Sequence, residues 1–577
     1  MRTSRGASLP RFGLTDTVLP LISVVLPLLV WCARYIGQDL WWDEITSLIY
    51  YSLQPLKETV RHLESTNNHI FFNLLINVFT RLIGERDFYV LMDRVPLLRG
   101  LQLAFGVVSV VITYVTGRRF FSPGTGWAAA LILTTTIPFL NFVEQLRGYI
   151  LSMMLVVLAL FHVWSYESRG RERHLFGLLI AIFCLVYTVL SNAYFVLVLG
   201  LIYVVQWLRG GETRPAALRI LITFFAAVVA LVLVYVPVWE DFRQVYARML
   251  GAAPPYRTFV LQERLPQVLW AFLSFRFVLP ILVVTGGVFL FRSPPTRIQR
   301  RRFIDLLALL VVPFLISFGR NELPYDRTFV HLAPIFALLA GVAIVALLHG
   351  WRFLWRRPLV WSIVLYLYCA GTLVYGHRLV QERLAGDLLA GRRDQDVLYN
   401  YYLSDVFTPG ADTRRCVEQM GRARRPVIGV DDVDRFATGF YFNRLDVTYY
   451  TTVALEELGP GSGGNTHYRG TYQRTNGRQS WPPLMHTKLE FDLPAELEGK
   501  EFRSLHSALR QNGILREHEP DFYVVTPFAD RFTALVERSY PQFRLQRLSD
   551  RVTYLNLFAV YDSGPVAPGA PGAPGAP

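Results

Sequence analysis

The chain has 577 residues, of which 52% are hydrophobic and only 18% are charged, and its formal net charge is +14. A soluble chain of average composition has about a quarter of its residues charged. The charge deficit falls in residues 14–375, where apolar runs of about twenty residues recur, a length that matches the hydrocarbon core of a bilayer. The positive charge lies in the short breaks between these runs, so it indicates membrane topology and excludes nucleic acid as a partner.

These apolar runs predict a polytopic α-helical membrane protein with about eleven transmembrane helices. The predicted spans are 17–36, 96–117, 125–143, 148–166, 175–190, 193–208, 220–238, 270–291, 303–319, 328–348 and 358–375. The sequence MRTSRGASLPRF precedes the first run, but no small-residue cleavage site follows that run. We therefore expect an uncleaved first helix and not a signal peptide.

Arginine residues distinguish the two sides of the predicted membrane domain. One alternating set of loops is rich in arginine: 118–119, 167–174, 208–219, 292–302 and 349–357. The short loops of the other set contain only Arg147, Arg320 and Arg327. Because arginine-rich loops stay in the cytoplasm, we expect the N-terminus inside and the C-terminal region outside. The arginine-rich, lysine-poor composition favours the inner (plasma) membrane of a bacterium.

The sequence divides into three predicted parts. Residues 1–375 form the membrane domain, whose first external loop, 37–95, contains an amphipathic segment at 68–84 that we expect at the membrane surface. Residues 376–563 predict an extracytoplasmic soluble α/β domain. Its β-type runs lie at 425–430, 521–527 and 552–561, and its helix-like stretches lie at 502–513 and 529–540. The Pro/Gly/Ala-rich tail, 564–577, is expected to be disordered.

Two acidic positions are candidates for chemistry on the external side. Asp43 and Glu44 follow the first predicted span in the sequence Asp-Leu-Trp-Trp-Asp-Glu. One interpretation is that they cap an interfacial helix beside an aromatic belt, and another is a general base or a metal ligand at the membrane surface. Glu144 lies in a very short external turn, where it either pairs with Arg147 or faces the same cavity as the first loop.

Further motifs follow these acids in a characteristic order. They are Asn67–His69, an aromatic helical segment ending in Leu-Ile-Gly, Arg94–Pro96, a span ending in Gly117–Phe121, and a turn containing Arg147–Tyr149. This order resembles the GT-C superfamily of integral membrane glycosyltransferases, and in particular the branch with protein O-mannosyltransferases and the lipid A aminoarabinose transferase. The clear match covers about residues 17–165, and the later helices agree in number and orientation. The predicted external α/β domain also resembles members of this group.

The resemblance implies an inverting glycosyltransferase that takes a sugar from a polyprenyl-phosphate donor. The sugar would pass, outside the cytoplasm, to a lipid, polysaccharide or protein acceptor. In the family pattern Asp43 is the catalytic base, Glu44 supports it, and Glu144 is the second acid of the same cavity. A carboxylate suits the first role because an acceptor hydroxyl is a poor nucleophile until its proton is removed.

The resemblance also implies residues for the acceptor and for the donor phosphate. His69, Tyr149 and Tyr325 would line the acceptor cavity, although many relatives have His or Lys followed by prolines where this chain has Asn67–His69. The departing phosphate needs positive charge, for which the external arginines are Arg147, Arg276, Arg320 and Arg327. Arg327 resembles an Arg-aromatic step before a late helix of the family, and its alternative is a snorkelling interfacial arginine.

A divalent metal ion held by Asp43 and Glu144 is compatible with this chemistry and is not required by it. Two other functions stay open. A transporter or flippase of lipid-linked substrates would place charged residues and broken helices near the bilayer midplane, whereas these acids lie at the external ends of the predicted helices. An inactive scaffold would share the same pattern, because a fold does not establish activity.

Overall fold

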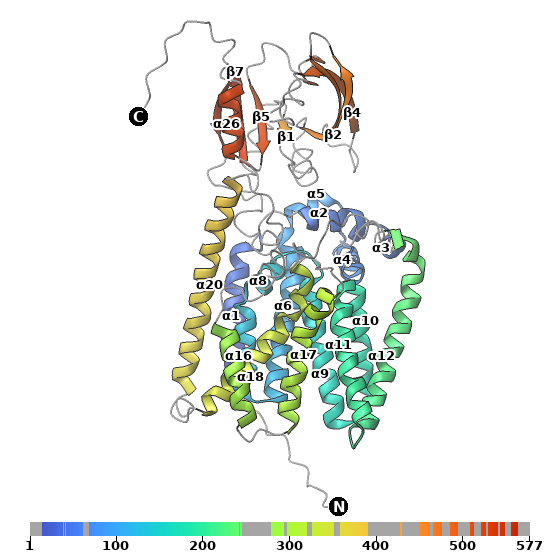
Figure 1. Ribbon diagram of the computed structural model, residues 1–577, viewed down its shortest axis with the longest axis vertical. Coiled ribbons are helices and arrows are strands. Elements are labelled where there is room, and N and C mark those ends of the chain that lie inside the picture. Colours follow the sequence, from blue (N-terminus) through green and yellow to red (C-terminus); the bar gives the residue numbers. More distant parts are fainter. Residues whose placement is uncertain are drawn as a thin grey trace, which may run out of the picture. The chain divides into compact units, whose positions relative to one another are not determined.

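Figure 1 shows the computed structural model of the chain. It describes residues 14–37, 40, 42–61, 68–241, 243–244, 278–292, 297–319, 326–350, 358–389, 427–429, 449–461, 465–475, 485–493, 508–509, 511–512, 521–526, 529–539, 543–548 and 556–562. The chain divides into two compact units. One consists of Met1–Gly37 and Ser47–His377, and the other consists of Gln38–Thr46 and Arg378–Pro577.

Helices account for the described chain up to residue 389. They are α1 (Leu14–Tyr35), α2 (Trp42–Ser47), the π-helix η1 (Leu48–Ser52), α3 (Leu56–Arg61), α4 (Ile70–Leu82), α5 (Phe88–Asp93), α6 (Val95–Phe120), α7 (Pro123–Thr134), α8 (Ile137–Glu144), α9 (Tyr149–Arg169), α10 (Arg173–Thr188), η2 (Leu190–Asn192), α11 (Ala193–Arg209), α12 (Arg214–Tyr235), η3 (Val236–Val238), α16 (Val278–Arg292), α17 (Arg297–Gly319), η5 (Asp326–Leu332), α18 (Ala333–Gly350) and α20 (Pro358–Leu389). The helix predicted within 68–84 is confirmed as α4, and its position at a membrane surface stays a prediction.

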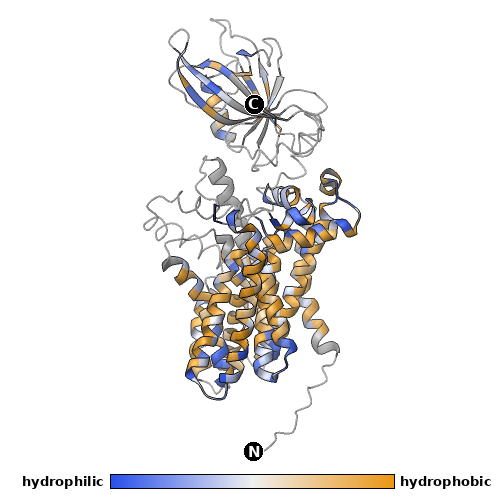
Figure 2. Ribbon diagram, turned by 90° about the vertical axis from the view of Figure 1, so that its right-hand side faces the viewer, coloured by the Kyte–Doolittle hydropathy of each residue, from blue (hydrophilic) through white to orange (hydrophobic). Residues whose placement is uncertain are grey.

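Several of these helices have the length and composition of membrane spans. Among the described residues, five are long and apolar enough to cross a bilayer: Val95–Phe120, Tyr149–Arg169, Leu190–Arg209, Arg214–Asp241 and Phe329–Gly350. Figure 2 shows apolar residues along the length of the helical bundle and hydrophilic residues near its ends. These helices support an integral membrane protein. The larger predicted number, about eleven spans, stays a prediction.

The centre of the bundle is formed by α18 and α9. In the apolar window of these two spans, 89% and 78% of the residues are buried, compared with 28% for the span that contains α12. α18 packs against α7, α16, α17 and α9. By contrast, α12 keeps Phe225 71% exposed and Leu233 66% exposed. Exposed apolar side chains of this size on an outer helix are suited to contact with lipid.

The predicted span at 125–143 is broken in the structure. Its two pieces, α7 and α8, form an angle of 62°. The hydroxyl groups of Thr134 and Thr135 donate to carbonyl oxygens one turn earlier, at 3.0 and 2.7 Å. Pro138 has no N–H group to continue the helical hydrogen bonds. The break makes Glu144 the last residue of the short helix α8.

Glycines allow α6 and α7 to approach each other closely. A Cβ atom on Gly126 would lie 2.7 Å from the backbone nitrogen of Arg118 and still closer to the carbonyl oxygen of Tyr114. A Cβ atom on Gly117 would lie 2.7 Å from the Cα atom of Gly126. Small residues at a helix crossing bring the two backbones together, and here a methyl group has no space.

In the C-terminal part, the described residues form a seven-stranded sheet and include the helix α26 (Ala529–Ser539). The strands are β1 (Val427–Gly429), β2 (Tyr449–Pro460), β3 (Thr466–Thr475), β4 (Met485–Leu493), β5 (Asp521–Thr526), β6 (Phe543–Arg547) and β7 (Asn556–Asp562). Their spatial order is β4-β3-β2-β1-β5-β7-β6. The central strand β1 is parallel to β2 and β5, and all other pairs are antiparallel.

Sequence analysis predicted some of the strands of this sheet. The β-type runs at 425–430, 521–527 and 552–561 are confirmed as β1, β5 and β7, and the helix at 529–540 is confirmed as α26. The sequence reasoning missed β2, β3, β4 and β6. These strands carry charged and polar residues on one or both faces, so their hydrophobic alternation is weak. Most of the predicted helix at 502–513 and all of the tail at 564–577 lie outside the described residues.

We predict that Gly126→Ala lowers the stability of the protein by about 1–3 kcal/mol, because the added methyl group forces α6 and α7 apart. Gly100→Ala is the matched control on α6, since nothing lies within 4 Å of the Cβ position of Gly100. Thermal unfolding in detergent would compare the two variants with the wild type. Equal midpoints for Gly126→Ala and Gly100→Ala would contradict the close crossing.

Candidate functional site

A buried backbone turn between α8 and α9 brings several of the predicted site residues together. Glu144 ends α8, Arg147 lies within the turn, and Tyr149 begins α9. All three are buried, and Arg147 is only 1% exposed. A turn that is buried in an apolar bundle needs partners for its own N–H and C=O groups, because neither lipid nor water supplies them there.

Helix α6 supplies one set of partners for this turn. The side-chain nitrogen of Gln102 donates to the carbonyl oxygens of Gln145 and Arg147, at 2.6 Å each. Gln102 is fully buried. The sequence reasoning missed this residue, although an amide side chain within an otherwise apolar span was a visible signal.

The first external loop supplies a second partner. The backbone N–H of Gly148 donates to Nδ1 of His69 at 3.0 Å, and the His69 ring meets the Tyr149 ring edge to face at a centroid distance of 4.8 Å. Since a backbone N–H can only donate, Nδ1 of His69 carries no proton in this arrangement. His69 and Tyr149, two residues predicted for the acceptor cavity, are therefore in direct contact.

Arg147 connects the turn to the residues that follow the acid pair. Its guanidinium donates to the hydroxyl oxygen of Ser47 and lies 5.9 Å from the centroid of the Tyr149 ring. Ser47 is the last residue of α2, the helix whose first turn contains Asp43 and Glu44. Asp43 is 3% exposed and Glu44 is 0% exposed. Carboxylates with so little exposure are rare in proteins unless they are paired or functional.

Gly148 and the start of α9 complete the packing of the turn. A Cβ atom on Gly148 would lie 2.7 Å from Cγ2 of Thr188 and 3.0 Å from Nδ1 of His69, so only glycine fits. Ser152 donates its hydroxyl to the carbonyl oxygen of Gly148 at 3.0 Å, and Asn192 donates to the Ser152 hydroxyl at 2.9 Å. Ser152 and Asn192 were not among the predicted site residues.

The loop helix α4 is held by its own buried asparagines. Asn73 donates to the side-chain oxygen of Asn68 at 2.8 Å and accepts from the Ser52 hydroxyl at 3.0 Å. Asn77 donates to the carbonyl oxygen of Gln54 at 2.7 Å. These bonds connect α4 to η1 and the segment after it, so the element that carries His69 at its start has a fixed position.

The structure does not describe the side chains of the remaining predicted phosphate and acceptor residues. Arg276, Arg320 and Tyr325 lie outside the described residues. Arg327 lies in η5, and its side chain is not among those described. η5 itself packs against α9, η2 and α18. Within the part of the chain that the structure describes, no group of three or more His, Cys, Asp or Glu residues is arranged to hold a metal ion.

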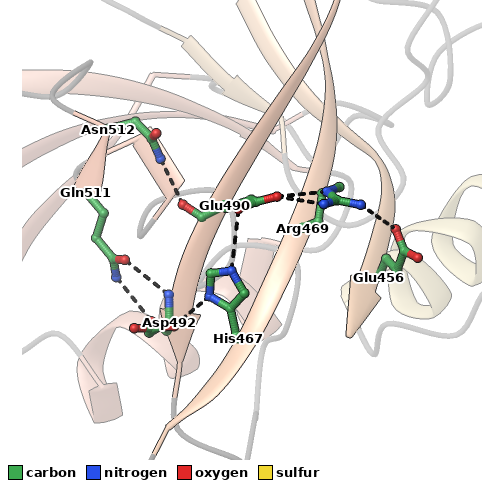
Figure 3. Close-up of polar contacts among 7 residues, drawn as sticks. All are labelled: Glu456, His467, Arg469, Glu490, Asp492, Gln511 and Asn512. Carbon is green, nitrogen blue, oxygen red and sulfur yellow. Dashed lines mark hydrogen bonds and ion pairs between the residues drawn. The ribbon is translucent and has the colours of Figure 1, made fainter. Parts of the chain in front are cut away.

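A second polar cluster lies on strands β2, β3 and β4 (Figure 3). His467 Nδ1 is 2.8 Å from Asp492 Oδ1, and its Nε2 is 3.5 Å from Glu490 Oε2. Arg469 bridges Glu490 at 2.7 Å and Glu456 at 3.7 Å. The hydrogen bond to Asp492, followed by that to Glu490, raises the pKa of His467 above its usual value. These side chains are partly exposed cross-strand pairs.

These features define a class of protein: a helical bundle of the membrane type, with a buried polar turn, and a C-terminal mixed sheet. Among solved structures, ArnT from Cupriavidus metallidurans bound to undecaprenyl phosphate is similar to this chain at 14% identity and a TM-score of 0.47, over 95% of this chain and 98% of that one. No protein-family model and no curated protein matches the chain.

The archaeal oligosaccharyltransferase AglB from Archaeoglobus fulgidus, in complex with an inhibitory peptide and a dolichol-phosphate, is similar at 12% identity and a TM-score of 0.39, over 73% of this chain and 59% of that one. The complex of the Archaeoglobus fulgidus oligosaccharyltransferase with Zn and sulfate is similar at 12% identity and a TM-score of 0.38, over 94% and 88%. ArnT and AglB both belong to the GT-C superfamily, the group that the sequence motifs resemble. At these TM-scores the likeness assigns no function to this chain.

We predict that Gln102→Leu destabilises the protein by about 1–3 kcal/mol or more, because two buried carbonyl oxygens of the turn lose their donor. Gln206→Leu is the matched control. Gln206 is also a glutamine within an apolar span, and its buried side-chain nitrogen has no hydrogen-bond partner among the described residues. Unfolding midpoints in detergent would separate the two. A loss as large for Gln206→Leu as for Gln102→Leu would contradict the role of the Gln102 bonds.

The raised pKa of His467 predicts that the stability of the β3–β4 hairpin depends on pH. A group whose pKa is higher in the folded state contributes stability that is fully present below its unfolded value, about 6.5, and is lost as the pH rises through the folded value. We expect His467→Gln to expose the β3 and β4 amides to hydrogen exchange more at about pH 5.5 than at about pH 8.5. Wild type and variant are compared at each pH, so the intrinsic exchange rate cancels. A difference that grows with pH would contradict the prediction.

Proposed function

We propose that this protein is an inverting glycosyltransferase that uses a polyprenyl-phosphate sugar and acts on the extracytoplasmic side of a bacterial inner membrane. The observation that supports this most is the burial of Asp43 and Glu44 in α2, whose last residue, Ser47, accepts a hydrogen bond from the buried Arg147. Buried acids and a buried cation are the groups that a reaction needs when it moves a proton and separates negative charge.

In the proposed reaction the Asp43 carboxylate takes the proton of an acceptor hydroxyl. The oxygen then attacks the anomeric carbon of the sugar, and the bond from that carbon to the phosphate oxygen breaks. The electron pair leaves with polyprenyl phosphate, and the configuration at carbon is inverted. Glu44 supports the orientation of Asp43, and Glu144 is the second acid of the cavity.

The arginines have different parts in this proposal. Because Arg147 is 1% exposed and bound to Ser47, it acts through the field of its charge and by holding the turn. Direct contacts to the donor phosphate are assigned to Arg276, Arg320 and Arg327, which follow later in the sequence. A guanidinium suits a phosphate because it can donate two parallel hydrogen bonds.

The acceptor side of the proposed site is formed by His69, Tyr149 and Tyr325. Edge-to-face contact fixes the first two relative to each other, so they present a rigid wall to an incoming hydroxyl-bearing molecule. The acceptor is a lipid, a polysaccharide or a protein. A divalent ion bound by Asp43 and Glu144 would add a further positive charge for the phosphate.

The test is transfer from a panel of radiolabelled polyprenyl-phosphate sugars by purified protein in nanodiscs, with membrane extract as the acceptor. We expect wild type to release polyprenyl phosphate and Asp43→Asn to do so about 10²–10⁴ times more slowly, because the general base is lost. Glu240→Gln is the control, an exposed acid shortly after α12 that pairs with the neighbouring side chains of Arg243 and Gln244. It should retain the wild-type rate.

The two alternative functions, a transporter or flippase and an inactive scaffold, would each give a different result from a glycosyltransferase. A transporter or flippase, reconstituted in vesicles, would move lipid-linked sugar across the bilayer without releasing polyprenyl phosphate. An inactive scaffold would show neither transfer nor transport. Equal rates for wild type and a folded Asp43→Asn variant would remove Asp43 from the base role and leave the transferase class standing.

A further inference from the structure

Arginines crowd together at the end of the bundle where α6 and α9 finish and where α10 and α17 begin. In Figure 1, α4 lies near the opposite end of the bundle. Two acids in this region are already paired. Glu167 accepts from Arg301 at 2.5 Å and from the Tyr203 hydroxyl at 2.9 Å, and Asp305 lies 3.8 Å from Arg301. Both carboxylates therefore compensate the charge of the same arginine.

Arg302 is buried nearby, and the charges of Glu167 and Asp305, which are both paired with Arg301, partly offset its own. Its guanidinium lies 4.7 Å from the centroid of the Phe120 ring and 5.5 Å from that of Trp164. It donates to the Ser168 hydroxyl at 3.1 Å. Arg302 is 6% exposed, and its buried Nε has no hydrogen-bond partner in the described chain. Burying a cation whose hydrogen-bond donors are only partly paired lowers the stability of the folded protein.

Arg119 is in a similar position against the same aromatic residues. Its guanidinium lies 5.1 Å from the centroid of the Phe120 ring and 5.0 Å from that of Phe161. Its buried Nη2 atom has no hydrogen-bond partner among the described residues. The surrounding charges of Arg169, Arg173 and Arg302 are all positive and repel it. Two guanidinium groups thus lie against the same Phe120 ring, and the charges that act on Arg119 are all repulsive.

His174 adds a further polar group to this cluster. It is 5% exposed, and its ring lies 6.3 Å from the Phe161 ring, which Arg119 also contacts. Its Nδ1 is 3.2 Å from Nδ1 of His162, so one of these nitrogens donates and the other accepts. The buried Nε2 of His174 has no partner in the described residues. Arg119, His174 and Arg302 are called the basic cluster below.

Within the cluster, the charges of Glu167 and Asp305 partly offset that of Arg302. The charges that act on Arg119 are those of other arginines. The connecting segments 293–296 and 351–357 contain no Asp or Glu, and the second contains three further arginines. Glu172 is bound to Arg219 at 2.5 Å. An anion from outside the chain would therefore offset the charge of Arg119. A phosphate group suits it, because phosphate oxygens accept several hydrogen bonds and match the guanidinium fork.

We propose that the basic cluster binds the phosphate of an anionic phospholipid. A lipid is favoured over a free anion because the cluster adjoins an apolar outer surface. On α10, Phe176 is 67% exposed and Ile180 is 43% exposed, and they begin two residues after His174. Acyl chains would lie along this surface while the headgroup phosphate meets Arg119. The arginine-rich loops are expected to be cytoplasmic, so the lipid belongs to the inner leaflet.

This proposal does not depend on the glycosyltransferase reaction, and its test needs no activity. Purified full-length protein in neutral detergent is titrated with phosphatidylglycerol, phosphatidylcholine or inorganic phosphate, and the unfolding midpoint is measured. Native mass spectrometry counts the bound lipid in parallel. The variant is Arg119→Gln, and the control is Arg171→Gln, an exposed arginine at the same end of the bundle.

We expect phosphatidylglycerol to raise the midpoint of wild type and Arg171→Gln, with little effect of the other two additives. Arg119→Gln should need about tenfold more phosphatidylglycerol for the same shift, because a charge-assisted hydrogen-bonding group is lost. Arg119→Lys, which keeps the charge and loses the fork, serves if the glutamine variant does not fold, and it should be weakened less. Equal titrations for the Arg119 variant and wild type would overturn the site. An equal shift with inorganic phosphate would overturn the lipid as its ligand.

Discussion

The hydrogen bonds around residues 145–148 are the interaction on which the arrangement of the helical unit depends. A backbone turn inside an apolar bundle has polar groups that lipid cannot satisfy. Gln102 of α6, His69 before α4 and Ser152 of α9 provide the partners. Because these residues are far apart in the sequence, the turn is stable only when their helices are assembled. The need to satisfy a few buried polar atoms therefore fixes how several apolar helices pack. Dispersion forces between apolar side chains alone would select one packing arrangement less specifically.

The arginine side chains at the two ends of the helical unit have different kinds of partner. Near the turn, the buried Arg147 is bound to the Ser47 hydroxyl and lies against Tyr149. At the other end, Arg301 shares two carboxylates, while Arg119 and Arg302 lie against aromatic rings. Rings attract a cation but accept no strong hydrogen bonds from it. This difference is the basis of the two proposals, catalysis near the turn and binding of an external anion at the other end.

Much of the architecture could be predicted from the sequence. Long apolar runs indicated the membrane helices, and amphipathic spacing located α4 before any tertiary information. Strands β1, β5 and β7 were found because they contain continuous apolar runs, whereas β2 to β4 were missed because charged residues such as Arg469 and Glu490 pair across the hairpins. The break between α7 and α8 was also missed, since threonines and a proline can lie within a span without interrupting it.

The sequence by itself determined which residue types are available: an acid pair after the first helix, an arginine and a tyrosine in a short turn, and arginines in alternate loops. These follow from composition and spacing, which are local properties. Only the tertiary structure decided that His69 accepts from Gly148, that Gln102 bridges two carbonyl oxygens, and that Arg119 lies against Phe120. The physical reason is that a hydrogen bond needs both partners at about 3 Å, and sequence spacing does not set the distance between helices.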